Sequence, residues 1–199
     1  MQSSGRAERP AGPRICVFCG SSSGDDPIFR ITAAAVGQEL AARGAALVYG
    51  GGRVGCMGAL ADAALAAGGY VIGVIPEALA AREVAHGSLS ELHLVASMHE
   101  RKALMTKLCD AFLALPGGFG TLDELFEAVT WRQLGYHTKP AAVLNVDGYY
   151  DALQRFCDDA ERAGFLRAAD RAGLVFGDEA APLLETLCAA IRAKRSPSP

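Results

Sequence analysis

The segment at residues 111–121 reads Ala111-Phe112-Leu113-Ala114-Leu115-Pro116-Gly117-Gly118-Phe119-Gly120-Thr121, a short apolar run that passes directly into a glycine-rich turn. A segment with helical periodicity follows this turn. Apolar runs of strand length alternate with helix-like segments in the same way from Arg14 to about Ile191. This alternation predicts an α/β fold with a mostly parallel sheet and helices on both of its faces.

The boundaries of the expected elements follow from the apolar runs and from the glycines and prolines between them. We expect strands at residues 15–19, 46–49, 70–75, 92–95, 111–115, 141–146 and 174–176. We expect helices at residues 28–43, 57–67, 98–109, 122–134, 149–163 and 181–194, and an irregular stretch at residues 76–90. No linker interrupts the pattern, so we predict one domain at residues 14–194 between disordered tails at residues 1–13 and 195–199.

The composition excludes several classes of protein. Of the 199 residues, 51% are hydrophobic and 21% are charged, which fits neither a disordered nor a fibrous chain. The net charge of −3, without a basic block, predicts that nucleic acid is not a partner. The longest apolar runs are too short to span a bilayer, and residues 1–14 lack the apolar core of a signal peptide. We therefore expect a soluble, cytoplasmic protein without a membrane partner.

The cysteines and histidines do not form the spacing of a redox or metal site. Cys16 and Cys19 form a C-x-x-C pair, but they lie in an expected strand, where residues three apart point to opposite faces. The six cysteines are otherwise widely spread, which favours a structural role. The four histidines match no metal-ligand motif, so we predict that the protein binds no metal.

Three glycine-rich loops follow expected strands, at residues 20–24, 50–55 and 116–121. Right-handed crossovers place such loops at one edge of a parallel sheet, where their backbone N–H groups and the next helix N-terminus can bind a phosphate. The second loop matches G-x-G-x-x-G, but it follows the second strand, and the next strand ends at Pro76 without an acidic residue for a ribose. No loop has the lysine typical of triphosphate sites. Together the loops predict a phosphorylated ligand.

A cationic helix start lies at residues 97–102. Ser97 and Glu100 form a capping-box pattern, and Arg101 and Lys102 follow it directly. Arg101 shares the spacing of the apolar stripe that should face the sheet, where a guanidinium needs an anion. That anion is either a protein carboxylate or a bound phosphate. A surface position would explain Lys102.

A second capping-box pattern, Thr121-Leu122-Asp123-Glu124, follows the third glycine loop. The pattern leaves two roles open for Glu124, a helix cap or a catalytic carboxylate. The apolar stripe of this helix leaves a second face with two acids and the only tryptophan of the chain, which predicts contact with a ligand or another subunit. The residues of that face are Glu124, Glu127, Ala128 and Trp131.

The string from Pro116 to Glu124 resembles the P-G-G-x-G-T-x-x-E motif of the LOG ("lonely guy") family, whose members are cytokinin riboside 5′-monophosphate phosphoribohydrolases. The segments Met98-His99-Glu100-Arg101-Lys102 and Thr130-Trp131 also match this family. The resemblance implies a Rossmann-like, doubly wound fold, a homodimer, no cofactor, and hydrolysis of N6-modified AMP to a free base and ribose 5-phosphate.

The resemblance also implies roles for individual residues. Arg101 and Glu124 would be the catalytic pair. The substrate-binding residues would be Glu83, Arg101, Lys102, Gly118, Phe119, Gly120, Thr121, Leu122, Asp123, Glu124 and Thr130. Cys56 and Arg132 depart from the residues common in the family, and Arg132 is a candidate to alter the base pocket or the dimer contact.

The chemistry of the residues agrees with that family. Cleavage of an N-glycosidic bond develops positive charge on the ribose, and a carboxylate beside it stabilises this cation or activates water. Two alternatives stay open: a general AMP nucleosidase without preference for modified adenine, and a non-catalytic carrier of a phosphorylated cofactor.

Overall fold

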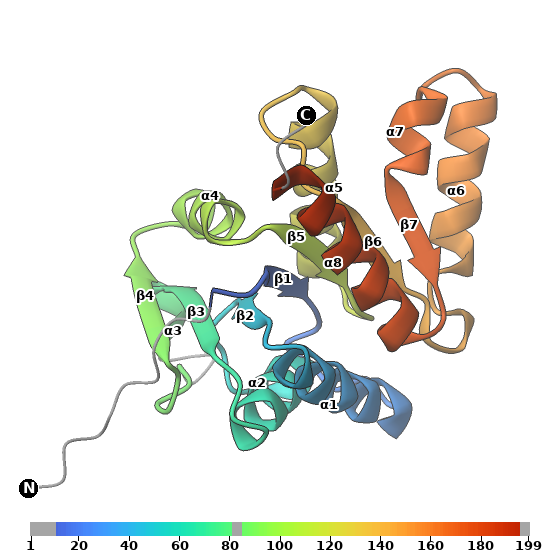
Figure 1. The fold of residues 1–199 in the computed structure, drawn as a ribbon. Coiled ribbons are helices and arrows are strands. Elements are labelled where there is room, and N and C mark those ends of the chain that lie inside the picture. The colour runs from blue at the N-terminus through green and yellow to red at the C-terminus, as the bar shows by residue number, and fades with distance from the viewer. Residues whose placement is uncertain (1–10, 81–84, 196–199) are drawn as a thin grey trace, which may run out of the picture.

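The computed structural model describes residues 11–80 and 85–195, which contain one seven-stranded sheet (Figure 1). The strands are β1 (Arg14–Phe18), β2 (Ala46–Tyr49), β3 (Val71–Pro76), β4 (Glu91–Val95), β5 (Ala111–Ala114), β6 (Ala141–Leu144) and β7 (Leu174–Gly177). Their order across the sheet is β4-β3-β2-β1-β5-β6-β7, and every pairing is parallel. The predicted α/β, doubly wound fold is confirmed, and the sheet is more regular than the mostly parallel one expected.

Helices connect the strands and cover both faces of the sheet. They are α1 (Pro27–Ala42), α2 (Gly55–Ala66), α3 (Glu77–Ala80), α4 (Met98–Leu108), α5 (Phe119–Gln133), α6 (Asp151–Arg162), α7 (Ala168–Ala172), α8 (Ala180–Arg195) and the 3-10 turn η1 (Val146–Gly148). Figure 1 shows α1 and α2 on one side of the sheet and α4 and α5 on the other. The short helices α3 and α7 and the turn η1 are elements that periodicity did not predict.

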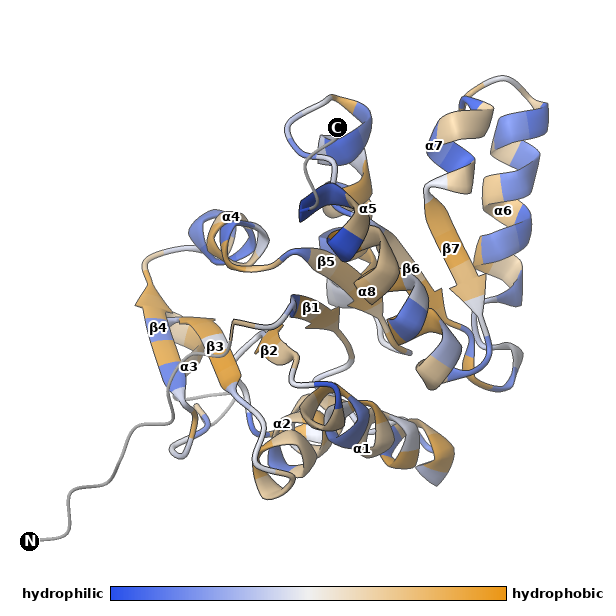
Figure 2. Cartoon of the chain, viewed as in Figure 1, coloured by the Kyte–Doolittle hydropathy of each residue, from blue (hydrophilic) through white to orange (hydrophobic). Residues whose placement is uncertain are grey.

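The sheet separates two hydrophobic cores. One contains buried residues of α1, α2 and α8, and the other contains buried residues of α4, α5 and α6. The central strands are hydrophobic throughout, whereas the edge strand β4 alternates between apolar and polar residues (Figure 2). Cys16 lies in the second core and Cys19 in the first, which confirms that they point to opposite faces. Burial raises the pKa of both thiols well above the ordinary value, so both remain protonated near neutral pH.

The strand order creates a crevice between β1 and β5. From β1 the chain adds β2, β3 and β4 on one side, and then returns to add β5, β6 and β7 on the other. The loops after β1 and β5 therefore leave the sheet in opposite directions, toward α1 and toward α5. In open parallel sheets such a reversal point is where ligands bind.

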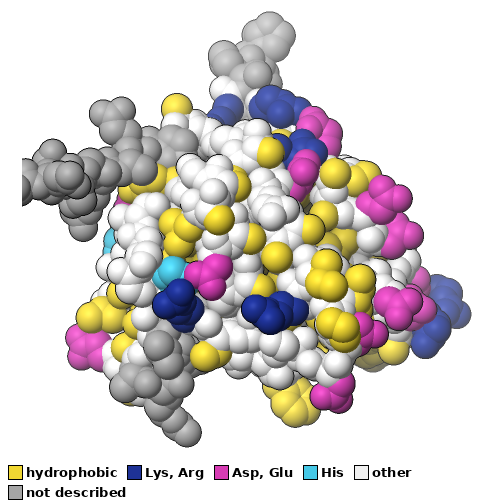
Figure 3. All heavy atoms as spheres, turned by 90° about the horizontal axis from the view of Figure 1, so that it is seen from below, with side chains coloured by type: hydrophobic (Ala, Val, Ile, Leu, Met, Phe, Trp, Pro, Cys, Tyr) yellow, Lys and Arg dark blue, Asp and Glu magenta, His cyan; other side chains and the backbone are white. Residues whose placement is uncertain are grey.

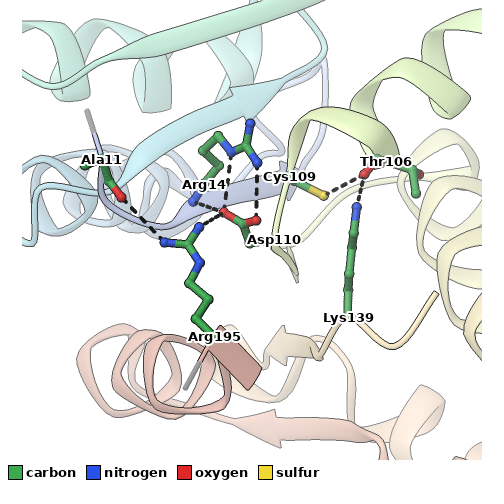
Figure 4. A network of polar contacts seen from close by, with 7 residues as sticks. All are labelled: Ala11, Arg14, Thr106, Cys109, Asp110, Lys139 and Arg195. Carbon is green, nitrogen blue, oxygen red and sulfur yellow. Dashed lines mark hydrogen bonds and ion pairs between the residues drawn. The ribbon is translucent and has the colours of Figure 1, made fainter. Parts of the chain in front are cut away.

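At the opposite edge of the sheet, an ion-pair network joins the two ends of the described chain (Figure 4). The carboxylate of Asp110 accepts hydrogen bonds from the backbone N–H and the guanidinium of Arg14, and from the guanidinium of Arg195 at 2.9 Å. Arg195 also donates to the carbonyl of Ala11. Ala11 and Arg195, which ends α8, thus make contacts at the two ends of the described chain. The domain bounds of residues 14–194 and the disorder of the tails stay predictions, and the tail residues 1–10 and 196–199 lie outside the described residues.

The surface carries mixed charge. On the face that includes α1 and α2, Lys and Arg side chains lie among Asp and Glu side chains and small hydrophobic areas (Figure 3). Within residues 11–80 and 85–195, no helix has the length and hydropathy needed to cross a membrane.

Asp110→Asn should lower the free energy of unfolding by about 1–2 kcal/mol at pH 7, because it removes the charge that pairs with two arginines. Burial by itself raises the pKa of Asp110, but hydrogen bonds and charge from Arg14, with the charge of Arg195, hold it below its ordinary value. A lowered folded-state pKa gives stability that is present above the unfolded-state pKa and is lost as the pH falls through the folded-state pKa. The difference measured by urea unfolding should therefore shrink below about pH 4.

The matched control is Asp159→Asn, which breaks an exposed ion pair with Arg162 on α6. This change should leave the free energy of unfolding within about 0.5 kcal/mol of the parent protein. If the effect of Asp110→Asn were the same at pH 7 and after acidification, the Asp110 charge would not be its cause.

Candidate functional site

A cavity of about 320 Å³ opens at the carboxyl edge of the sheet, beside the point where the strand order reverses. Its volume lies in the range of small-molecule sites. The three glycine-rich loops meet here, as their positions after parallel strands predict. The cavity is lined by Val17, Cys19, Gly20, Ser21, Gly50, Met57, Leu79, Met98, Arg101, Gly118, Phe119, Gly120, Thr121 and Glu124.

The N-terminus of α5 faces this cavity with unused backbone donors. Gly118 is the N-cap residue, and no side chain caps the helix. Within the described part of the chain, no carbonyl or side chain accepts a hydrogen bond from the N–H groups of Phe119, Gly120 or Thr121. A side chain at Gly118 or Gly120 would meet open space, so neither residue screens these groups. A helix N-terminus of this kind favours an anion through its N–H groups and its dipole.

The second glycine loop does not offer the same donors. The N–H groups of Cys56 and Met57 in the first turn of α2 donate to the carbonyls of Ser22 and Gly20, each at 3.3 Å. The first loop therefore occupies the N-terminus of α2. The N–H groups of Cys56 and Met57 are therefore not available to a ligand, and the participation of all three loops in phosphate binding stays a prediction.

Arg101 of α4 lines the cavity and is only 5% exposed. Its Nη2 donates to the carbonyl of Gly50 at 3.1 Å, its Nη1 contacts the sulfur of Met98, and its Nε has no hydrogen-bond partner among the described residues. No carboxylate of the described residues lies within ion-pair distance of it. Of the two alternatives for its counter-anion, these contacts favour a bound ligand over a structural ion pair.

Gly50 has a steric reason to lack a side chain. A Cβ at this position would lie 2.0 Å from Nη2 of Arg101. Glycine at the end of β2 therefore makes room for the guanidinium that its own carbonyl holds. This requirement explains the first glycine of the G-x-G-x-x-G match without a dinucleotide.

Glu124 lies in the second turn of α5 and lines the cavity with Arg101. The predicted capping box at residues 121–124 is wrong, because α5 begins at Phe119 and Thr121 is a buried residue of its first turn. Of the two roles left open for Glu124, the helix cap is thereby excluded. The charges around Cys19 agree with this position: burial, Cys56 and Glu124 raise the pKa of the Cys19 thiol, and Arg101 lowers it.

The capping box at Ser97 is confirmed in a modified form. The Ser97 hydroxyl accepts a hydrogen bond from the Glu100 N–H at 3.2 Å. The Glu100 carboxylate accepts from the N–H of Ala96 at 2.9 Å, one residue before the expected partner. This reciprocal cap starts α4 and sets the position of Arg101 in its first turn.

Lys102 connects α4 to α5. Its ammonium lies 3.0 Å from the carboxylate of Asp123 and 3.1 Å from that of Glu127. Burial lowers the pKa of Lys102, but the hydrogen bonds and charges of these two acids raise it above its ordinary value. Neither Lys102 nor Asp123 lines the cavity, so the surface position considered for Lys102 is replaced by an ion pair between two helices.

The other predicted site residues lie in different places. Leu122 is half-buried against the core and Thr130 is exposed on α5, and neither lines the cavity. Glu83 lies outside the described residues. The guanidinium of Arg132 donates to the carbonyl of Gly173 at the end of α7, so among the described contacts it reaches neither the cavity nor the face of α4 and α5.

Met57, Leu79 and Met98 form an apolar wall of the cavity that sequence reasoning missed. Such residues are common in cores, so their position at an edge of the sheet carries no signal without the fold. In the part of the chain that the structure describes, no group of three or more His, Cys, Asp or Glu side chains could hold a metal ion.

A second, open cavity of about 700 Å³ lies on the outer face of α4 and α5. It is lined by Ala103, Thr106, Lys107, Trp131, Tyr136, His137 and Lys139. Burial, and the charges of Lys139 and Arg132, lower the pKa of His137, so this face carries a neutral imidazole at pH 7. Leu134 and Tyr136 beside it are 65% and 76% exposed. This face has the apolar and aromatic character of a contact surface.

Comparison with solved structures supports the fold. The chain superposes on the Moco carrier protein of Chlamydomonas reinhardtii with a TM-score of 0.68, covering 92% of this chain and 99% of that one at 20% identity. It superposes on the molybdenum cofactor binding protein of Rippkaea orientalis with a TM-score of 0.69 at 21% identity, covering 90% of this chain and 98% of that one. At this identity the likeness extends to the Rossmann-like fold alone.

Sequence comparison identifies the family as well as the fold. Residues 57–187 match the family model described as possible lysine decarboxylase. The chain is 50% identical over 174 residues to the probable cytokinin riboside 5′-monophosphate phosphoribohydrolase LOGL1 of Oryza sativa subsp. japonica, covering 87% of this chain and 78% of the relative. It is 48% identical over 174 residues to the cytokinin riboside 5′-monophosphate phosphoribohydrolase LOG2 of Arabidopsis thaliana, covering 87% and 82%. With its P-G-G-x-G-T-x-x-E helix start and its buried arginine, the chain therefore belongs to the LOG family of cytokinin riboside 5′-monophosphate phosphoribohydrolases.

Proposed function

We propose that the protein hydrolyses the N-glycosidic bond of an N6-modified AMP, a cytokinin riboside 5′-monophosphate, to the free base and ribose 5-phosphate. The observation that carries this proposal is the pairing of Arg101 with Glu124 in one cavity beside the open N-terminus of α5. The cavity thus combines donors for an anion with a carboxylate. This combination fits a phosphorylated sugar whose reacting carbon lies away from its phosphate.

The 5′-phosphate is proposed to lie between the N–H groups of residues 118–121 and the guanidinium of Arg101. The phosphate would supply the anion that the buried guanidinium needs. Its binding energy then positions the ribose, although the phosphate itself takes no part in bond breaking.

Glu124 is proposed to act on the ribose. As the bond from the anomeric carbon to the base nitrogen breaks, the base takes the bonding electron pair and positive charge develops on the sugar. A carboxylate at this point stabilises that charge, or takes a proton from the water whose oxygen forms the new bond to the anomeric carbon. The proton lost by the water is balanced by the proton that the departing base nitrogen gains, so the net reaction adds one water to the substrate and needs no redox partner.

Two alternatives remain distinct from this proposal. A general AMP nucleosidase would cleave AMP as well as its N6-modified form, and release of adenine and isopentenyladenine from their monophosphates separates the two. A non-catalytic carrier of a phosphorylated cofactor would need the anion site but no carboxylate at the sugar. The likeness to cofactor carriers is one of fold alone, and Glu124 in the cavity favours the enzyme.

The remaining family positions keep proposed roles. We propose that Lys102, Leu122, Asp123 and Thr130, together with Glu83, contribute to the substrate site. We further propose a homodimer that covers the outer face of α4 and α5, because Leu134, Tyr136 and the half-buried Trp131 are apolar there. Residues 102 and 130 directly precede the cavity-lining Ala103 and Trp131 of that face, so a second copy would lie next to them. The buried, free cysteines favour a reducing compartment such as the cytoplasm.

The test of the proposed function is a comparison of one modified adenine as riboside, 5′-monophosphate and 5′-triphosphate. Two or three charge-assisted hydrogen bonds to the phosphate should give the monophosphate a kcat/KM at least about 10³-fold above that of the riboside. The triphosphate should also be a poor substrate, because no lysine among the described residues that line the cavity is placed for further phosphates. The measurement is release of ribose 5-phosphate or ribose.

Arg101→Ala is the matched variant for this comparison. It should reduce kcat/KM for the monophosphate and leave that for the riboside near its low parent value. Similar values of kcat/KM for all three substrates in the parent protein would refute the phosphate site.

Glu124→Gln should leave the protein folded and lower kcat by about 10²-fold or more, because the amide keeps the shape of the side chain but loses its charge. Thermal unfolding followed by circular dichroism checks the fold, and the rate of base release checks the reaction. Near-parental turnover in a folded variant would remove Glu124 from the mechanism.

The dimer is tested by light scattering on the purified protein. The expected mass is about twice the 20.7 kDa of one chain. The double change Leu134→Asp and Tyr136→Asp should give monomers, because it places charges on two exposed apolar positions of the face. A monomeric parent protein at micromolar concentration would contradict the dimer.

A further inference from the structure

Three successive carbonyl groups before α5 are each held by a donor from another part of the chain. The Leu115 carbonyl accepts a hydrogen bond from the hydroxyl of Tyr150 at 2.8 Å. The Pro116 carbonyl accepts from the N–H of Gly20 at 3.2 Å. The Gly117 carbonyl accepts from the hydroxyl of Tyr149 at 2.8 Å. The turn that leads into the anion site is therefore held by donors from the first glycine loop and from the segment before α6.

The bond to Gly117 has a direct consequence for the cavity. In a trans peptide the C=O and the following N–H point in opposite directions, so the group that holds the Gly117 carbonyl also sets the direction of the Gly118 N–H. Glycine on both sides leaves this peptide unit free to rotate in the absence of a partner. The Tyr149 hydroxyl removes that freedom at the peptide unit that opens the N-terminus of α5.

The surroundings of Gly117 leave little room for another way to hold the turn. A Cβ on Gly117 would lie 2.1 Å from Oγ1 of Thr121 and 2.8 Å from the N atom of Gly20. The turn is thus packed between the first glycine loop and α5, with glycine required at its centre. A side chain of the turn itself cannot fix the orientation, so the fixing group comes from outside.

Tyr149 is itself held by its neighbours. Its ring packs edge-on against Phe29 at 5.4 Å and against Tyr150 at 4.8 Å between ring centroids. The backbone N–H of Tyr150 donates to the side chain of Asn145 at 2.6 Å, which anchors the segment after β6. The two tyrosines differ in burial, because Tyr149 is 45% exposed and Tyr150 only 3%.

We propose that Tyr149 is a positioning residue that orients the Gly117–Gly118 peptide unit and, through it, the N–H groups that bind the substrate phosphate. The inference rests on the proposed function, because it takes the N-terminus of α5 as the phosphate site. Tyr149 lines a neighbouring cavity of about 270 Å³ that shares Gly20, Ser21 and Gly118 with the cavity of Arg101 and Glu124. Its hydroxyl proton is donated to the Gly117 carbonyl, so we assign its effect on the Arg101 cavity to the turn.

Tyr150 has a different role. Its hydroxyl donates to the buried carbonyl of Leu115. Burial raises the pKa of this hydroxyl, and the backbone of Gly117, which also interacts with it, lowers that pKa. A backbone N–H of Gly117 belongs to the Pro116–Gly117 peptide unit, so Tyr150 does not hold the Gly117–Gly118 unit that Tyr149 holds.

The experiment measures the dissociation constants of AMP and adenosine by calorimetry in the full chain. The Glu124→Gln background prevents hydrolysis during the titration. Tyr149→Phe keeps both ring contacts and removes only the hydroxyl. It should weaken AMP binding by about 3- to 10-fold, leave adenosine binding unchanged, and shift the Tm by less than about 2 °C.

Tyr150→Phe is the matched control, because it removes a hydroxyl–carbonyl bond of the same length from the next residue. It should lower the Tm through the unpaired buried carbonyl and leave the ratio of the AMP and adenosine constants unchanged. The proposal is overturned if Tyr149→Phe binds AMP as tightly as its parent, or weakens AMP and adenosine equally. An equal change of the ratio in Tyr150→Phe would also overturn it.

Failure of the proposed reaction is a separate result. If the chain with Glu124 intact prefers AMP to adenosine in binding but releases no ribose 5-phosphate, the hydrolase is refuted and the role of Tyr149 is still decided by the binding ratio. If it shows no preference for AMP, the anion site fails and the proposal for Tyr149 fails with it.

Discussion

A buried guanidinium that has no carboxylate partner among the described residues is the constraint on which the site depends. A desolvated charge is costly unless an anion compensates it, and Arg101 has only a backbone carbonyl and a thioether as contacts among the described residues. The surrounding residues follow from this charge. Gly50 lacks a side chain because the guanidinium occupies that space, and the open N-terminus of α5 adds a second attraction for the same anion.

The parallel sheet makes this arrangement possible, because it brings the loops after β1, β2 and β5 to one edge. The loops then have different hydrogen-bonding roles. The carbonyls of Gly20 and Ser22 accept hydrogen bonds from the N–H groups of Met57 and Cys56 in the first turn of α2, so these two donors are not available to a ligand. The turn before α5 has its carbonyls held from outside by two tyrosines and Gly20, so its N–H groups face the cavity. The N–H groups of Cys56 and Met57 at the start of α2 thus have acceptors, whereas those of residues 119–121 at the start of α5 have none among the described residues.

The relative position of the two cavity residues depends on an ion pair that lies outside the cavity. Arg101 and Glu124 come from different helices, α4 and α5. Their sequence neighbours, Lys102 and Asp123, form a contact of 3.0 Å, and Glu127 one turn later adds a second carboxylate. The helices are thus cross-linked one residue away from each cavity side chain. This is a physical reason for a lysine directly after the arginine, independent of any contact with substrate.

The sequence by itself determined the α/β class, nearly every strand and long helix, and the burial of Arg101, because strand and helix periodicity are local properties that burial enforces. Local patterns misplaced the start of α5, since glycine at position 118 serves as N-cap without a side-chain signal. They also placed Ala128 on the face of α5 that was predicted to contact a ligand or another subunit, whereas its small side chain is buried in the core. Only the tertiary structure decided that Glu124 is not a helix cap and that Lys102 forms ion pairs with α5. It also decided that carbonyls of the first glycine loop accept hydrogen bonds from the first turn of α2. These outcomes depend on contacts between residues distant in sequence, whose partners no local spacing specifies.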